Sequence, residues 1–192
     1  RGLPCNMGAI MKISRKHGLK VIEDVAQAAG GTYRGKMLGT FGDAGCFSFD
    51  AYKIIASGEG GMLITDNEKT YIRAQSWHDT AACWRPNRYE RERMPGELFC
   101  GENYRMSQIQ GAIALVQLRR LGSYLSALRK RKNLLSEEIK NRPGTLSLAP
   151  VNDTAGDCST GLILLADNGA EAKKKILELK KKGVPAGGIY DQ

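Results

Sequence analysis

The stretch that decides the fold reads V-I-E-D-V-A-Q-A-A-G-G (residues 21–31), then G-D-A-G-C-F-S-F-D-A-Y-K (residues 42–53), then S-G-E-G-G-M-L-I-T-D (residues 57–66). Each of these three pieces is an apolar run that ends in small or polar residues. That pattern is typical of strands in a buried sheet that bring polar side chains to one edge of the sheet. The stretch therefore predicts a sheet whose edge carries Asp24, Gln27, Ser48 and Lys53.

A helix is predicted before the first of these strands. Asn6 is a typical N-cap, an apolar stripe begins at Met7, and Gly18 is a typical C-cap. We then predict a buried strand over residues 19–22, with Asp24 at its exit. A helix that leads into a buried strand indicates an α/β layer structure with a mostly parallel sheet, and ligands gather at the carboxyl ends of such strands.

Asp24 and Lys53 are the residue types that a pyridoxal phosphate site needs. A lysine amine bonds covalently to the cofactor aldehyde, and a carboxylate beside the ring nitrogen keeps that nitrogen protonated. Residue types alone leave another interpretation open, because most acids and lysines are surface groups. In that interpretation Asp24 is an ordinary helix cap and Lys53 an exposed loop cation.

Four motifs resemble, in order and at matching separations, the pyridoxal-phosphate sugar aminotransferases of the DegT/DnrJ/EryC1/StrS family. They are E-D-V-A-Q-A-x-G from Glu23, G-T-F-G-D-A-G-C-F-S-F from Gly39, K-x-x-x-S-G-E-G-G from Lys53, and G-E-N-Y-R-M-S-Q-I-Q-G-A-I-A-L-V-Q-L from Gly101. The resemblance is strong from Leu19 to Leu121 and looser beyond. It implies an α/β, aspartate aminotransferase-like three-layer sandwich, called fold type I.

The same resemblance implies how the chain is divided. Residues 1–121 would form part of the large cofactor-binding domain, and residues 122–142 a long connecting helix that Pro143 and Gly144 end. Residues 143–192 would begin a small C-terminal α/β domain, with a strand over 160–166, a helix over 170–182 and a second strand from 183. Members of the family are much longer, so we expect the chain to be truncated at both ends. We also expect the isolated chain to bind the cofactor poorly or not at all.

The resemblance assigns roles to five residues. Asp24 would hold the pyridinium nitrogen, and Gln27 would approach the face or the phenolic oxygen of the ring. Ser48 would bind the cofactor phosphate, and Lys53 would carry the cofactor. Asn103 would bind the phosphate in the active site of a partner subunit, so that a homodimer becomes part of the mechanism. Local alternatives remain open: a turn residue for Gln27, a plain strand hydroxyl for Ser48 and a capping residue for Asn103.

The implied activity moves an amino group from glutamate or glutamine to a keto sugar, either nucleotide-linked or of the octulosonate type, for surface polysaccharides or natural products. Related sugar dehydratases of this fold carry a histidine where the aminotransferases keep lysine, so Lys53 favours transamination. A non-catalytic binding or regulatory protein on the same fold is the other alternative.

Two departures concern the rim of the site. The family usually has His-Gly where this chain has His78-Asp79, which leaves the details of the substrate rim open. A polar loop follows over residues 83–96, and loops of this kind are often functional. Its arginines, together with Arg105 after the loop, are candidates for binding a substrate carboxylate or phosphate: Arg85, Arg88, Arg91 and Arg93.

Composition excludes several other classes. The net charge is +9, but the basic groups at residues 129–132, 173–175 and 180–182 are not interleaved with aromatics, so we interpret them as solvated helix faces and not as a nucleic-acid patch. The five cysteines are odd in number and form no C-x-x-C pair, which favours a reducing compartment and a cytoplasmic location. Two histidines make a histidine-rich metal site improbable. No apolar run reaches the roughly 20 residues that a membrane span needs.

Overall fold

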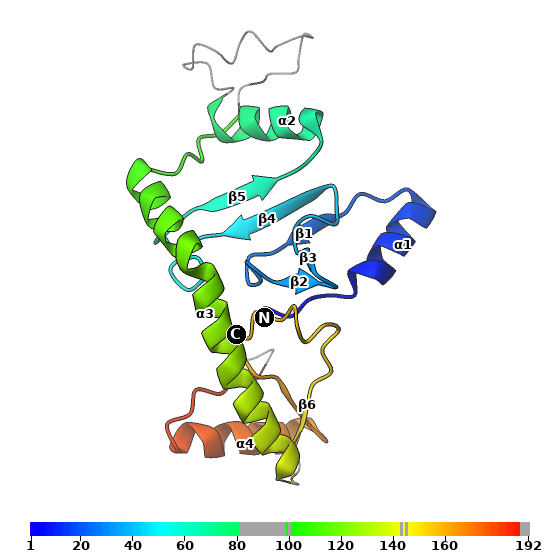
Figure 1. Ribbon diagram of the computed structural model, residues 1–192, viewed down its shortest axis with the longest axis vertical. Coiled ribbons are helices and arrows are strands. Elements are labelled where there is room, and N and C mark those ends of the chain that lie inside the picture. Colours follow the sequence, from blue (N-terminus) through cyan, green and yellow to red (C-terminus); the bar gives the residue numbers. More distant parts are fainter. Residues whose placement is uncertain (81–98, 100, 143, 145, 189–192) are drawn as a thin grey trace.

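The computed structural model describes residues 1–80, 99, 101–142, 144 and 146–188. The helices are α1 (Met7–His17), α2 (Glu68–His78), α3 (Gln108–Asn141) and α4 (Gly169–Lys181). The strands are β1 (Ile22–Asp24), β2 (Thr32–Tyr33), β3 (Lys36–Met37), β4 (Ala44–Ser48), β5 (Gly61–Ile64), β6 (Leu146–Leu148) and β7 (Leu164–Ala166). Helix α3 runs along the long axis of the molecule, from the side of the sheet at one end to α4 and β6 at the other (Figure 1).

Local sequence explains the two N-terminal helices. The Asn6 side chain accepts a hydrogen bond from the backbone N–H of Ala9, and Gly18 ends α1 in the left-handed conformation at φ 64°. The Asn67 side chain caps α2 by accepting from the N–H of Thr70. The predicted bounds of α1 are therefore confirmed to within about one residue at each end.

The sheet has the order β1-β4-β5, with β1 parallel to β4 and β4 antiparallel to β5. A mostly parallel sheet is thus correct for the first pair and wrong for the second. The predicted buried strand over residues 19–22 is also wrong, because β1 begins only at Ile22, whose side chain is 70% exposed. The N–H of Leu19 donates to the Ser14 carbonyl and so completes the end of α1 instead of pairing in a sheet.

The core lies between α1, the β2–β3 hairpin and the middle of α3. Met7, Tyr33, Leu38 and Leu125 are buried together there. Helix α3 approaches this core closely because Gly30 lies beneath it at φ 82°. A Cβ atom at Gly30 would stand 2.6 Å from the Cδ1 of Leu125, so only glycine leaves room for the helix.

The C-terminal part differs from its predicted β-α-β order. Helix α4 is confirmed, but the strand predicted over residues 160–166 begins only at Leu164. That strand, β7, pairs antiparallel with β6, a strand that the sequence analysis missed. The second strand predicted from Gly183 is wrong for residues 183–188, which are irregular. Pro185 lacks a donor for sheet pairing and Gly187 and Gly188 weaken strand formation, which accounts for the difference.

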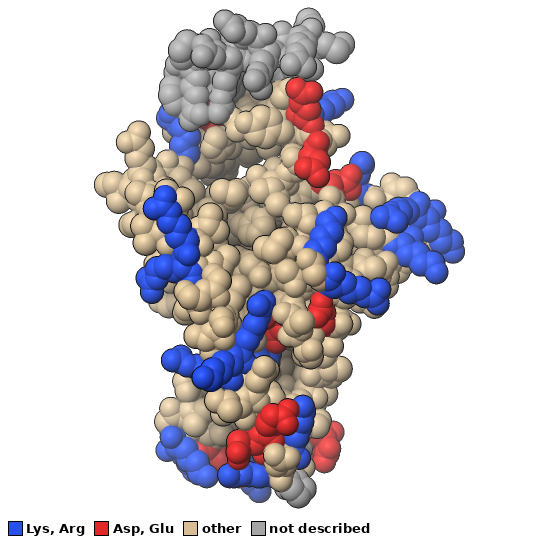
Figure 2. Space-filling model, viewed as in Figure 1, with Lys and Arg blue, Asp and Glu red and all other residues tan. Residues whose placement is uncertain are grey.

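Basic side chains form separate groups over α1, α3 and the α4 end, with Asp and Glu among those at the α4 end (Figure 2). The predicted solvated face at residues 129–132 is only partly correct. Lys132 turns inward and its side chain is 13% exposed, and the Nε of Arg129 donates to the carbonyl of Asp157 at 2.8 Å. Both are held by a carboxyl-terminal segment that the helical pattern alone does not reveal.

Candidate functional site

The parallel pairing of β1 and β4 brings Asp24 and Ser48 to the same edge of the sheet. Asp24 ends β1 and is in register with Cys46 of β4. Ser48 ends β4 two residues further on, so its side chain shares a sheet face with those of Cys46 and Asp24. Phe47 points to the opposite face and packs against the core. The edge predicted from the sequence is therefore present for these two residues.

Asp24 is exposed and oriented by its own turn. Its Oδ1 accepts a hydrogen bond from the N–H of Ala26 at 2.9 Å, an Asx turn that reverses the chain after β1. Val25, between them, is buried in the core. Gln27 follows in the same turn with an exposed side chain. Both polar groups after β1 thus lie at the surface of the described part, where a ligand can reach them.

The neighbouring Glu23, and not Asp24, is the structural acid of this strand. Its side chain is buried and accepts backbone N–H groups from Gly39 at 2.8 Å, Phe41 at 2.6 Å and Gly42 at 2.8 Å. These bonds fix the glycine-rich turn that leads into β4. This role of Glu23 was not predicted from the sequence, although the alternation of side chains along a strand turns adjacent acids to opposite faces.

Lys53 lies in a turn that starts from the end of β4. Its N–H donates to the Asp50 carbonyl at 3.0 Å, and its side chain is half-buried. The next residues, Ile54 and Ile55, pack into the core, and the N–H of Ser57 returns to the Phe49 carbonyl at 2.9 Å. Because the turn is closed by these bonds and anchored by these apolar groups, the Lys53 backbone is held just beyond the edge that carries Asp24 and Ser48.

Asn103 lies away from these residues in the fold, at the end of α2. It forms an isolated antiparallel bridge with Asp79, the residue that follows α2, and the N–H of Tyr104 donates to the carbonyl of His78 at 2.9 Å. Its side chain is exposed. Its Oδ1 accepts a hydrogen bond from the Nε of Arg105 at 3.0 Å. The structure therefore places Asp24 and Ser48 on one sheet face and Lys53 in the turn that follows β4. Asn103 lies on a separate element.

The candidate arginines divide into two groups. Arg85, Arg88, Arg91 and Arg93 lie outside the described residues. Arg105 is described, and its Nε stands 3.4 Å from Oδ1 of Asp79, whose side chain is completely buried. Asp79, the departure from the family pattern, is thus an internal partner of Arg105.

Other kinds of site find no support in the described part of the chain. One hollow in this part is lined by residues of α3, β6, β7 and α4, such as Leu135, Leu146 and Lys175, and by none of the five predicted site residues. Across residues 1–80, 99, 101–142, 144 and 146–188, no three His, Cys, Asp or Glu side chains are grouped so as to hold a metal ion. Within the same residues, no helix is both long and apolar enough to cross a membrane.

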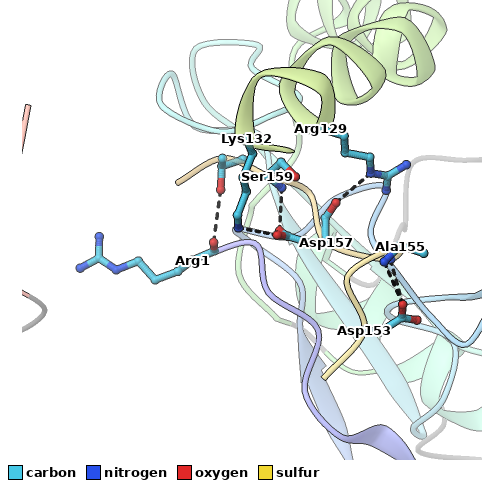
Figure 3. Close-up of polar contacts among 9 residues, drawn as sticks. Arg1, Arg129, Lys132, Asp153, Ala155, Asp157 and Ser159 are labelled. Atoms are coloured by element: carbon cyan, nitrogen blue, oxygen red, sulfur yellow. Dashed lines mark hydrogen bonds and ion pairs between the residues drawn. The ribbon is translucent and has the colours of Figure 1, made fainter. Parts of the chain in front are cut away.

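A segment over residues 153–160 joins the C-terminal part to the rest (Figure 3). Asp153 accepts the N–H of Arg34 at 2.6 Å, and the N–H of Thr32 donates to the Gly156 carbonyl at 3.0 Å. Asp157 forms an ion pair with Lys132 of α3 and accepts the N–H of Ser159 at 2.7 Å. This joining segment therefore contacts both α3 and the β2–β3 hairpin and links the two.

Comparison with known proteins identifies the fold and the family of the chain. The fold is the α/β fold of pyridoxal-phosphate-dependent transferases of fold type I, as predicted. The chain belongs to the DegT/DnrJ/EryC1/StrS aminotransferase family, which it matches over residues 1–192. The predicted family is therefore confirmed.

Several curated relatives are named for amino-sugar enzymes. GDP-perosamine synthase of Caulobacter vibrioides is 40% identical over 131 residues, which is 66% of this chain and 32% of that protein. Spore coat polysaccharide biosynthesis protein SpsC of Bacillus subtilis is 40% identical over 149 residues, 73% of this chain and 35% of that protein. The chain thus spans about a third of the length of these relatives.

Solved structures resemble the chain along almost all of its length. The E. coli GDP-4-keto-6-deoxy-D-mannose-3-dehydratase with bound hydrated PLP superposes with a TM-score of 0.77 and 26% identity, covering 96% of this chain and 50% of that one. An aminotransferase from Psychrobacter cryohalolentis gives a TM-score of 0.74 and 29% identity, covering 95% of this chain and 50% of that one. Both an aminotransferase and a dehydratase share this fold, so the fold alone does not choose between the two reactions.

Proposed function

We propose that this chain is part of a pyridoxal-phosphate-dependent aminotransferase that converts a keto sugar to an amino sugar. Family membership and the names of the curated relatives support the proposal. The single observation that carries it to particular residues is the shared edge of β1 and β4, with Asp24 and Ser48 on one face and Lys53 in the turn that follows.

The residues at this edge fit the cofactor by the chemistry of their side chains. Asp24 offers an exposed carboxylate, and Ser48 offers a hydroxyl on the same face of the sheet. A carboxylate suits a protonated ring nitrogen, and a hydroxyl suits a phosphate oxygen. Lys53 supplies a primary amine on a backbone that its turn holds in place. Gln27 would lie against the ring from the turn after β1, and Asn103 would reach the phosphate from a second subunit.

In this proposal the cofactor supplies an electron sink for the bond broken at the carbon of the amino donor. The Nζ of Lys53 would act first as a general base that takes the proton from that carbon. It would then act as a general acid that returns the proton in a later step. The Asp24 carboxylate keeps a positive charge on the ring nitrogen. Glutamate or glutamine would be the donor, and the keto sugar would be nucleotide-linked or of the octulosonate type.

A homodimer is part of the proposal. Helix α3 supports it, because its N-terminal half presents apolar side chains at helical spacing to solvent: Ile109 is 74% exposed, Ile113 42% and Val116 53%. An apolar stripe of this kind is typical of a surface that a protein partner covers.

We also propose a cytoplasmic location. The described cysteines Cys5, Cys46 and Cys158 are free, which agrees with it.

Borohydride trapping tests the proposal on the full-length protein. Incubation with pyridoxal phosphate and reduction should attach the cofactor permanently to one peptide, the peptide that contains Lys53. Lys53→Arg keeps the charge but should abolish both the attachment and the absorbance of the bound cofactor. Attachment at another lysine, or unchanged absorbance in Lys53→Arg, would contradict the assignment.

Turnover distinguishes the reaction. With glutamate and a nucleotide-linked keto sugar, an aminotransferase forms 2-oxoglutarate and an amino sugar in equal amounts. A dehydratase on the same fold would form a deoxy sugar that keeps no nitrogen. A binding protein would form neither product, although it would still retain the cofactor. Mass spectrometry of the sugar product therefore separates the three alternatives.

A further inference from the structure

We propose that Asp79 and Arg105 form a positioning pair that orients the carboxamide of Asn103 toward a phosphate group. This inference rests on the proposed function, in which Asn103 meets the cofactor phosphate of a second subunit. It goes further by assigning to Asp79 and Arg105 a role that acts through Asn103.

The first step is the position of Asp79. It follows α2, its N–H donates to the Gln75 carbonyl at 3.1 Å, and its side chain is completely buried. The bridge to Asn103 ties this buried residue to the next segment. A carboxylate in such a place needs a cationic partner, because burying an unpaired charge is costly. Arg105 provides it, with Nε at 3.4 Å from Oδ1.

The second step is the orientation of Asn103. Its Oδ1 accepts from Nε of Arg105 at 3.0 Å and from the N–H of Arg105 at 3.4 Å. Arginine has donors only, so the atom that faces Nε must be the amide oxygen and not the nitrogen. Because a carboxamide is planar, fixing the oxygen places the two N–H donors of Nδ2 on the other branch. Donors directed away from the protein suit an anion such as phosphate.

The third step is rigidity. The backbone on both sides of Asn103 pairs with the end of α2: the N–H of Thr80 donates to the Glu102 carbonyl at 3.1 Å, and the N–H of Tyr104 donates to that of His78 at 2.9 Å. Gly101 passes so close to the Trp77 backbone that a Cβ atom would not fit. The Asn103 side chain is therefore the exposed end of a fixed structure, and its orientation depends on the Arg105–Asp79 pair.

The test compares two ligands on the full-length protein: pyridoxal phosphate and pyridoxal, which lacks the phosphate. Absorbance gives both dissociation constants, and the constant for pyridoxal divided by the constant for pyridoxal phosphate measures the contribution of the phosphate to binding. Asp79→Asn and Arg105→Gln should each reduce this ratio about tenfold and change the pyridoxal constant less than about twofold. Arg105→Lys should behave like Arg105→Gln, because an ammonium group does not reproduce the position of Nε.

Asp79→Asn gives the sharpest outcome because simple electrostatics predicts the opposite sign. Removing a negative charge would strengthen the binding of an anion, whereas loss of the positioning pair weakens it. Asn103→Ala should reduce the ratio as well, and adding Asp79→Asn to it should cause no further loss. The control is Arg73→Gln, a cation on α2 that lies over the Phe99 ring and should leave the ratio unchanged.

Three results would overturn the inference: a ratio that stays or rises in Asp79→Asn, additive losses with Asn103→Ala, or an equal weakening of pyridoxal. A wild-type protein that binds neither ligand, or whose bound-cofactor absorbance survives Lys53→Arg, would instead refute the proposed function.

Discussion

Lys132 of α3 and Asp157 of the joining segment form an ion pair in which the side chains are only 13% and 5% exposed (Figure 3). The second carboxylate oxygen of Asp157 accepts the N–H of Ser159, and its carbonyl accepts the Nε of Arg129. Asp157 thus joins two residues of α3 to a segment that is distant in sequence, and a pair so deeply buried depends on both partners.

Removing one partner of this pair should be costly. Lys132→Met leaves the Asp157 carboxylate buried without its cation, and we expect a loss of about 3 kcal/mol in the free energy of unfolding, measured by urea denaturation. The control is Lys140→Met, which breaks an exposed pair with Glu137 and should cost less than about 0.5 kcal/mol. Equal effects of the two variants would show that the buried pair contributes no more than a surface pair.

Glu23 should matter for stability more than any other acid of the sheet. Glu23→Ala leaves the N–H groups of Gly39, Phe41 and Gly42 without their carboxylate, and we expect a loss of about 3 kcal/mol. Glu23→Gln keeps one acceptor oxygen and should lose about half of that. Thermal unfolding followed by circular dichroism measures both, and a Gln variant as damaged as the Ala variant would contradict the role of the accepted bonds.

Gly45 of β4 lies against the backbone of Gly39. A Cβ atom at Gly45 would stand 2.6 Å from the Gly39 Cα and would meet the Gly39 carbonyl oxygen as well. Gly45→Ala should therefore destabilise the fold by about 2 kcal/mol. Gly111 of α3 is the matched control, because nothing lies within 4 Å of the added atom. Gly111→Ala should stabilise the helix by up to about 1 kcal/mol, and loss of stability there would be unexpected.

Cys158 should be unreactive in the folded protein. Burial, and secondly the neighbouring Asp157 carboxylate, raise the pKa of its thiol from 9.0 to about 11. Iodoacetamide at pH 8 should modify the exposed Cys5 and leave Cys158 intact until urea is added, as judged by peptide mass spectrometry. Folding favours the neutral thiol, so its contribution to stability is complete below pH 9.0 and is lost as the pH rises to about 11. Cys158→Ser should lessen that alkaline loss.

Asp24 and Asp153 should separate catalysis from stability. Asp24→Asn keeps an oxygen for the N–H of Ala26 but loses the charge, so turnover should fall about a hundredfold or more while the melting temperature changes little. Asp153→Asn should lower the melting temperature and leave turnover almost unchanged. Hydrogen bonds from the backbone N–H groups of Arg34, Gly156 and Ala155 lower the pKa of Asp153, so its stabilisation holds above pH 3.8 and is lost as the pH falls. Parallel losses of turnover and stability in Asp24→Asn would remove its assigned role.

Capping residues and sequence motifs made part of this fold predictable from the sequence. Asn6 and Gly18 act locally, so the bounds of α1 could be predicted to within about a residue. Strand β6 was missed because three residues are too few for a clear periodic signal, and its strand conformation depends on the pairing with β7. The start of β1 was misplaced because Leu19, apolar like a strand residue, completes the end of α1.

The candidate site was predictable only where the motifs named residues. Asp24, Ser48 and Lys53 were named in this way, and the register of β1 and β4 places Asp24 and Ser48 on one face of the sheet. The Asp79–Arg105 pair could not be foreseen, because burial of Asp79 depends on how α2 meets residues 101–105. The roles of Lys132 and Arg129 also depend on a contact with Asp157, which is distant in sequence.

The continuity of α3 has a mechanical consequence. Its 34 residues form one unbroken helix, about 50 Å long at the usual rise. The buried Leu125 lies near its middle, where the helix is held against the core. A tilt of a few degrees there would carry the Ser107 end, next to Asn103, and the Asn141 end, next to β6, in opposite directions. A displacement of α4 and the β6–β7 hairpin would therefore move the Ser107 end of α3 directly, without a change in the sheet.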